Sequence, residues 1–184
     1  MSQTALHEAA HALAARKLKV AVLHVIATGE NPHCRVRYRI NGPIEEATDA
    51  LHRQAVIALA GPQVEHPGSS AAETDRLNAL RYCCEAIAAE RGNSLEALDA
   101  NQLLAALNLF DRLATVAADL VKKNLPLIAR LAHRLEDAGE LSGAAVNMII
   151  GGTQDPVDPR GGIFAIRRYV ETLARNGRVR VPKN

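Results

Sequence analysis

Several features that define protein classes are missing from this sequence. No apolar run approaches the roughly 18 residues that a helix needs to span a bilayer, and the N-terminus lacks the basic and apolar regions of a secretory signal. Of three cysteines, Cys34 stands alone and Cys83 adjoins Cys84, which is no disulfide framework. These absences predict a protein of the reducing cytoplasm that does not contact a membrane.

Aromatic residues and excess charge are also scarce. The 184 residues include no Trp, two Phe and three Tyr, and the net charge of +2 is too small to suggest a polyanionic partner. Basic residues gather towards the C-terminus, but they are scattered and carry no recognition motif, so we interpret them as a solvated face. We expect no nucleic-acid partner for this group: Arg160, Arg167, Arg168, Arg175, Arg178, Arg180 and Lys183.

The abundant residues are aliphatic. Hydrophobic residues make up 48% of the chain and are mostly Ala, Leu, Ile and Val, which favours a mainly α-helical fold with a single core. The exception lies near the N-terminus, where residues 20–26 are rich in β-branched side chains and residues 34–40 alternate apolar with basic ones. A turn signal at residues 29–32 separates these segments, so we expect a small β-hairpin.

Helical patterns account for most of the remaining sequence. Ser70 and Glu73 fit a capping box, and Pro126 suits the first turn of a new helix. Ser142 is placed to cap a short helix that ends near Ile150. The expected helices span residues 4–17, 44–60, 70–91, 101–123, 125–137 and 143–150. We expect one domain over residues 1–150 and a C-terminal extension over 151–184, with a loop and a possible helix at 164–175.

The segment His7-Glu8-Ala9-Ala10-His11 carries the clearest chemical signal. Two histidines four residues apart lie on one face of a helix, with Cβ atoms about 5–6 Å apart, so both imidazoles can converge on one zinc ion. Glu8 is turned around the helix and can act as general base on a zinc-activated water. His24 and His33 have no such spacing, and we interpret them as structural or exposed.

A catalytic zinc needs a third protein ligand and an open position. Spacing alone leaves six candidates: Glu65, His66, Glu73, Asp75, Glu85 and Asp119.

Four segments, in order, resemble one protein family. Residues 4–13 are similar to the active-site helix of the FtsH-type ATP-dependent zinc proteases, although Ala10 replaces the family's Gly. Residues 57–65 (IALAGPQVE) resemble the family's "ALAGRAAE" helix, and residues 69–77 (SSAAETDRL) resemble its "TTGASNDL" segment. Residues 121–150 are similar to its C-terminal helices. The resemblance therefore covers residues 4 to about 150.

The resemblance implies a mostly helical zinc peptidase domain with a small β element. It nominates Asp75 as the third zinc ligand beside His7 and His11, with Glu73 and His66 as alternatives. It also implies that substrate lies extended beside an edge strand, which the hairpin could supply.

One departure from the family changes the expected activity. The sequence has no ATPase module or Walker motif. We therefore expect an ATP-independent zinc metalloendopeptidase that cleaves flexible peptides or unfolded proteins delivered by a separate unfoldase or adaptor. The alternative is a catalytically inactive, peptidase-like binding or regulatory module.

Overall fold

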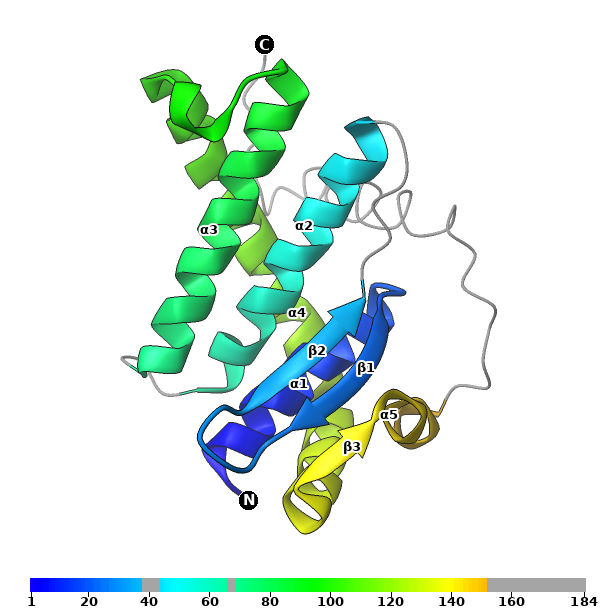
Figure 1. Cartoon of the computed structure of the whole chain (residues 1–184). Coiled ribbons are helices and arrows are strands. Elements are labelled where there is room, and N and C mark those ends of the chain that lie inside the picture. Colours follow the sequence, from blue (N-terminus) through cyan, green and yellow to red (C-terminus); the bar gives the residue numbers. More distant parts are fainter. Residues whose placement is uncertain (38–43, 66–68, 152–184) are drawn as a thin grey trace.

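The computed structural model describes residues 1–37, 44–65 and 69–151, and its fold is mainly helical with a small sheet near the N-terminus, as predicted (Figure 1). The extension beyond Gly151, with its basic residues and the expected helix at 164–175, lies outside these residues. The elements are α1 (Gln3–Lys17), β1 (Ala21–Ile26), β2 (His33–Arg37), α2 (Ile44–Ala60), the 3₁₀ helix η1 (Gly61–Val64), α3 (Ser70–Arg91), the 3₁₀ helix η2 (Leu95–Ala97), α4 (Ala100–Ala138), β3 (Glu140–Ser142) and α5 (Gly143–Ile150).

The sheet has three antiparallel strands in the order β2-β1-β3. The hairpin of β1 and β2 was predicted, whereas β3 was not, because three residues are too few to show a pattern. The strands turn Val25, Cys34 and Leu141 towards the core, and α1 lies directly behind the sheet in Figure 1. The described sheet therefore covers the helix that carries the His7–His11 motif.

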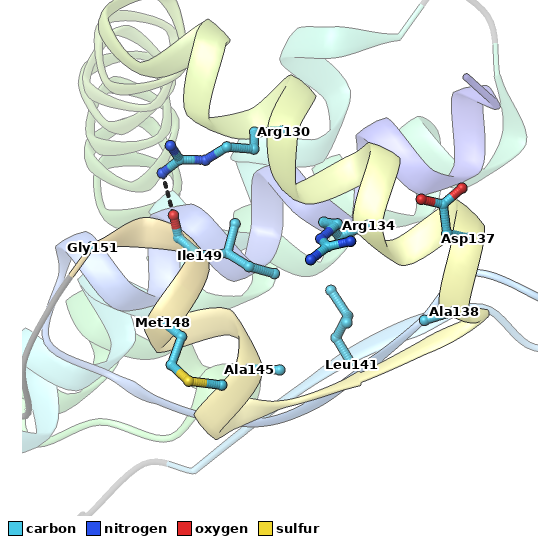
Figure 2. Close-up of a pocket in the computed structure, with 9 residues that line it drawn as sticks. All are labelled: Arg130, Arg134, Asp137, Ala138, Leu141, Ala145, Met148, Ile149 and Gly151. Carbon is cyan, nitrogen blue, oxygen red and sulfur yellow. Dashed lines mark hydrogen bonds between the residues drawn. The ribbon is translucent and has the colours of Figure 1, made fainter.

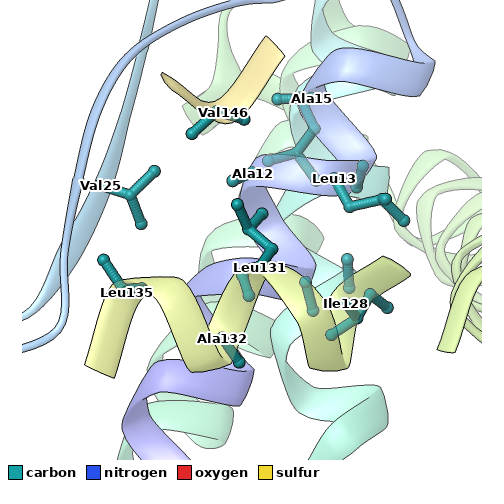
Figure 3. Packing of buried hydrophobic residues seen from close by; sticks show 14 of the residues in the cluster. Ala12, Leu13, Ala15, Val25, Ile128, Leu131, Ala132, Leu135 and Val146 are labelled. Carbon is teal, nitrogen blue, oxygen red and sulfur yellow. The ribbon is translucent and has the colours of Figure 1, made fainter. Parts of the chain in front are cut away.

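Two hydrophobic clusters form the core, and α4 contributes to both. The first joins α1, the sheet, α5 and the second half of α4; Figure 3 shows Leu13 of α1 beside Ile128 and Leu131 of α4. The second cluster lies between α2, α3 and the first half of α4. Small alanines line α1, so neighbouring elements can approach its backbone closely and hold the helix in a fixed position.

Helix α4 runs without a break through Pro126, so the predicted division into two helices is wrong. Proline removes one backbone hydrogen bond from a helix interior. Both halves of α4 are nevertheless anchored by buried side chains, Leu113 in the second cluster and Leu131 in the first. Tertiary packing therefore outweighs the local preference.

The start of α3 differs by one residue from the prediction. Ser69, not Ser70, is the N-cap, and its hydroxyl accepts a hydrogen bond from the Ala72 backbone amide at 3.1 Å. This detail matters because Ser69 also contacts a residue of the candidate site.

Among the residues described here, no helix combines the length and the apolar character that crossing a membrane requires.

Candidate metal centre

His7 and His11 lie on one face of α1 with their imidazoles in contact. Both residues are buried, with 4% and 8% of their surfaces exposed. The two Nε2 atoms are 2.8 Å apart, and the rings meet nearly edge to face, with an interplanar angle of 80°. The helical spacing thus brings the two nitrogens together, as the motif predicts.

Asp75, in the second turn of α3, approaches both histidines. Its Oδ2 atom lies 2.8 Å from His7 Nε2 and 3.0 Å from His11 Nε2. In the described part of the chain, these three residues form the one cluster of histidine, cysteine and carboxylate groups whose donor atoms could share a metal ion. The structure therefore brings together the three residues that the resemblance nominates.

The other third-ligand candidates do not join this cluster. Glu73 is exposed on α3, Glu85 pairs with Arg81 on the same helix, and Asp119 lies elsewhere on α4. His66 is outside the described residues. Glu65 is close, but it contacts the far side of the His7 ring, as described next.

The second nitrogen of each histidine faces an acceptor. His11 Nδ1 lies 2.6 Å from the Ile57 carbonyl oxygen, which can only accept, so Nδ1 carries the proton. His7 Nδ1 lies 2.7 Å from Glu65 Oε1, although the N–H direction falls outside hydrogen-bond geometry. A small rotation of the carboxylate aligns the pair, so the proton of His7 is on Nδ1. Both Nε2 atoms then present lone pairs to Asp75.

Glu65 links the two helices that supply the cluster. Its carboxylate contacts His7 through Oε1, and its Oε2 accepts a hydrogen bond from the Ser69 hydroxyl. Ser69 in turn caps α3, the helix that carries Asp75. Orienting contacts of this kind behind metal-binding histidines are usual in metalloproteins. Spacing in the sequence makes Glu65 a candidate ligand but does not predict this orienting role.

The donor set fits a metal ion. Two imidazole nitrogens and one carboxylate oxygen meet at 2.8–3.0 Å. With the ring protons on the two Nδ1 atoms, all three atoms present lone pairs to one another. Acceptors that converge in a buried site need a cation between them. The distances between these three atoms are slightly shorter than the separation of about 3.3 Å that is expected between ligand atoms lying 2.0–2.1 Å from a tetrahedral zinc ion. His7, His11 and Asp75 could therefore hold zinc after a small expansion.

Gly61 is the second residue that the sequence analysis did not assign to the site. A Cβ atom at this position would lie 2.5 Å from His11 Nε2 and 2.6 Å from His7 Cε1, which is closer than atoms can approach. Gly61 begins η1, directly after α2. In the sequence, the Gly61-Pro62 pair indicates a break after α2 and does not by itself indicate this role. The role of Gly61 is to leave space for the two rings.

Glu8 lies among the same groups without joining the cluster. Burial raises the pKa of Glu8, while the nearby charges of His11 and His7 oppose that effect. Its Oε2 atom is buried and has no hydrogen-bond partner in the described structure. Burial also disfavours ionisation of Asp75. In the metal-free protein a proton can take the place of the cation, and hydrogen bonds from His11 and His7 then outweigh burial and lower the pKa of Asp75 to about 2. This carboxylate is thus ionised near neutral pH, and Glu8 keeps a free proton-accepting oxygen.

A separate surface cavity lies between α4 and α5 (Figure 2). It has a volume of about 770 Å³ and is lined by none of the predicted site residues. Arg130 at its rim donates a hydrogen bond to the Ile149 carbonyl near the end of α5. We assign this contact a structural role, because it satisfies one of the carbonyls left open at a helix end.

Comparison with known proteins adds no assignment: no family model matches the chain, and no curated protein matches it.

Proposed function

We propose that this chain is a zinc-dependent metallopeptidase in which His7, His11 and Asp75 bind the metal and Glu8 is the general base. The observation that carries the proposal is the convergence of three acceptor atoms within 3.0 Å of one another in a buried site. A merely structural histidine pair would not need a carboxylate between its unprotonated nitrogens. The acceptors beside both Nδ1 atoms support the same arrangement.

The residues of the chain divide the chemical work. His7, His11 and Asp75 together contribute one negative charge, so the centre would keep one net positive charge after binding Zn²⁺. Zinc supplies the Lewis acidity that polarises a peptide carbonyl and makes a water molecule more acidic. Glu8 receives the proton of the attacking water on its unpartnered oxygen and passes it to the departing amine.

The substrate that we propose is an extended, flexible peptide. Strand β2 forms one edge of the described sheet, so backbone groups on its outer side can pair with an added strand. Cys34 of β2 lies near enough to Glu8 for the carboxylate charge to contribute, after burial, to raising the pKa of the thiol. The strand edge and the proposed base are therefore neighbours. Folded chains cannot pair in this way, which favours unfolded or partner-delivered substrates.

We also propose a reducing, cytoplasmic setting. All three cysteines are free thiols, and burial raises the pKa of Cys83 to about 12, which keeps it unreactive.

The test is the Glu8→Gln variant of the full chain, loaded with zinc. We expect it to retain one zinc equivalent but to cleave an unstructured peptide about 10²–10⁴ times more slowly than the parent, because the base is lost. Glu73→Gln, the same change at an exposed position on α3, is the matched control and should cleave normally. Equal rates for the Glu8→Gln variant and the parent would contradict the mechanism. If the zinc-loaded parent binds peptides and cleaves none, the chain is a peptidase-like binding module.

A further inference from the structure

The β-hairpin brings together a second pair of histidines. His24 of β1 and His33 of β2 are nine residues apart in sequence, yet their Nε2 atoms are 3.1 Å apart. Their rings meet at 74° with centroids 5.2 Å apart. The corresponding Nε2 separation for His7 and His11 is 2.8 Å. Two imidazoles therefore face each other at a metal-chelating distance on the hairpin as well.

The strand register explains why no sequence pattern predicts this contact. His33 pairs with Ile26, and His24 pairs with Arg35, so the two histidines are diagonal neighbours on the same face of the hairpin. An irregularity between Val22 and His24 shifts the register at this point. Neither feature can be derived from a spacing of nine residues. The interpretation of His24 and His33 as structural or exposed therefore did not include their contact.

One of the two rings is already oriented. The Nδ1 atom of His33 lies 2.8 Å from the Asn31 carbonyl oxygen, which can only accept a hydrogen bond. The proton of His33 is therefore on Nδ1, and its Nε2 lone pair points at His24. Carbonyl contacts of this kind fix the tautomer of metal-binding histidines. In the metal-free protein, His24 Nε2–H donates to this lone pair. When a cation binds between the two Nε2 atoms, the ring proton of His24 moves to its own Nδ1.

From this geometry we propose that His24 and His33 form a second binding site, for a divalent transition-metal cation such as Zn²⁺. Imidazole nitrogen suits zinc, nickel and copper, whereas calcium and magnesium prefer oxygen ligands. No third histidine, cysteine or carboxylate joins the pair among the described residues, so water completes the coordination. The site is therefore weaker than the three-ligand centre, and it fills second.

Metal binding at the pair is independent of the proposed peptidase activity, because it needs neither Glu8 nor Asp75.

The test measures zinc stoichiometry in the full chain by equilibrium dialysis against zinc chloride at neutral pH. We expect two equivalents for the parent, one for His24→Ala/His33→Ala, and one weakly bound equivalent for His7→Ala/His11→Ala. His133→Ala, which removes an exposed histidine of α4, is the control and should keep two. Two results would overturn the proposal. In the first, the parent and the His24→Ala/His33→Ala variant both bind two equivalents of zinc. In the second, the parent binds only one equivalent, and only the His7→Ala/His11→Ala variant loses it.

A second variant covers the case in which the double alanine variant fails to fold. His24→Gln keeps an amide that can donate to His33, so the hairpin contact survives while the chelating nitrogen is lost. We expect an unchanged melting temperature and loss of the second equivalent, and its retention would overturn the proposal. If instead the parent binds one zinc equivalent and only the hairpin variants lose it, the result contradicts zinc binding at the proposed catalytic centre and supports zinc binding at His24 and His33.

A charge change should adjust the affinity without touching a ligand. Arg35 lies across the strand pair from His24, and its positive charge opposes cation binding. Arg35→Gln should tighten the second equivalent about threefold at low salt, an effect that added salt screens. Weaker binding of zinc by the Arg35→Gln variant would contradict a site at this position.

Discussion

Two histidine pairs in this molecule bring their Nε2 atoms to similar separations, 2.8 Å for His7–His11 and 3.1 Å for His24–His33. The first pair is on a helix, is buried, and has Asp75 Oδ2 within 3.0 Å of both nitrogens. The second spans a hairpin, is half-buried, and has no such carboxylate among the described residues. Pair distance therefore does not distinguish the proposed catalytic centre from the proposed hairpin site. The carboxylate of Asp75 does.

Removing the third ligand should make the two pairs alike. Asp75→Ala leaves two imidazoles at the helix site, and we expect zinc affinity there to fall by more than about 100-fold, since even the loss of an orienting group behind a ligand weakens binding 10–100-fold. Competition with a chromophoric chelator measures the change. Glu73→Ala, two residues away on the exposed side of α3, is the control. Parental zinc affinity in Asp75→Ala would show that Asp75 is not a ligand.

Enlarging Gly61 should separate the helix pair while leaving the hairpin pair intact. Ala at this position puts a methyl group within 2.7 Å of both rings, so they must move apart. Overpacking of this kind costs about 1–3 kcal/mol, which predicts a loss of zinc affinity of roughly 30-fold.

Gly143→Ala provides the contrast to Gly61→Ala. Its Cβ atom would overlap the Val22 carbonyl oxygen of β1 instead of the histidine rings. It should lower the melting temperature without changing the affinity for the first zinc equivalent. If Gly61→Ala binds that zinc as tightly as Gly143→Ala does, the proposed packing of Gly61 against the ligands is wrong.

The carboxylate behind His7 should have a smaller effect. Glu65→Gln keeps the size of the side chain but weakens the acceptor beside His7 Nδ1, and we expect about a tenfold loss of zinc affinity. A purely structural role would change stability alone. Nitrogen NMR of the His7 ring, showing a mixture of tautomers in the metal-free variant, would separate the two roles. Unchanged affinity together with an unchanged tautomer would contradict the positioning role.

His52 is a half-buried histidine outside both pairs. Burial, followed by the charge of Arg112, lowers the pKa of His52 to about 4. Since this lies below the unfolded value of about 6.5, the unfolded chain takes up a proton first as pH falls, and the free energy of unfolding decreases towards pH 4. Between pH 7.5 and 5.5 the loss amounts to roughly 1 kcal/mol. Denaturant titrations should show that His52→Gln lacks this part of the pH dependence; an identical pH slope in parent and variant would contradict it.

Local patterns predicted most of the secondary structure. Helices α1, α2, α3 and α5 were expected within about a residue of their observed ends, because each has a cap or a clear apolar period. Strand β3 and the continuity of α4 were not predicted. Both depend on tertiary contacts: β3 exists because Leu141 pairs with Val25, and Pro126 is tolerated because buried residues on either side anchor the helix.

The site was predictable only where its geometry is local. The spacing of His7 and His11 determines their shared face, so the sequence suffices for that pair. Asp75 is 64 residues from His11, and only the family resemblance chose it from six candidates. The contact between Glu65 and His7, the space left by Gly61 and the meeting of His24 with His33 all depend on how separate elements pack. No sequence pattern within a single helix or strand predicts these contacts.

The most direct test of the central claim is the zinc content of the full chain after metal reconstitution and dialysis against a weak chelator, which strips the weaker hairpin pair. The account predicts one retained equivalent for the parent and for His24→Ala/His33→Ala, and none for His11→Ala. A parent that retains no zinc, or a His11→Ala variant that retains a full equivalent, would contradict it.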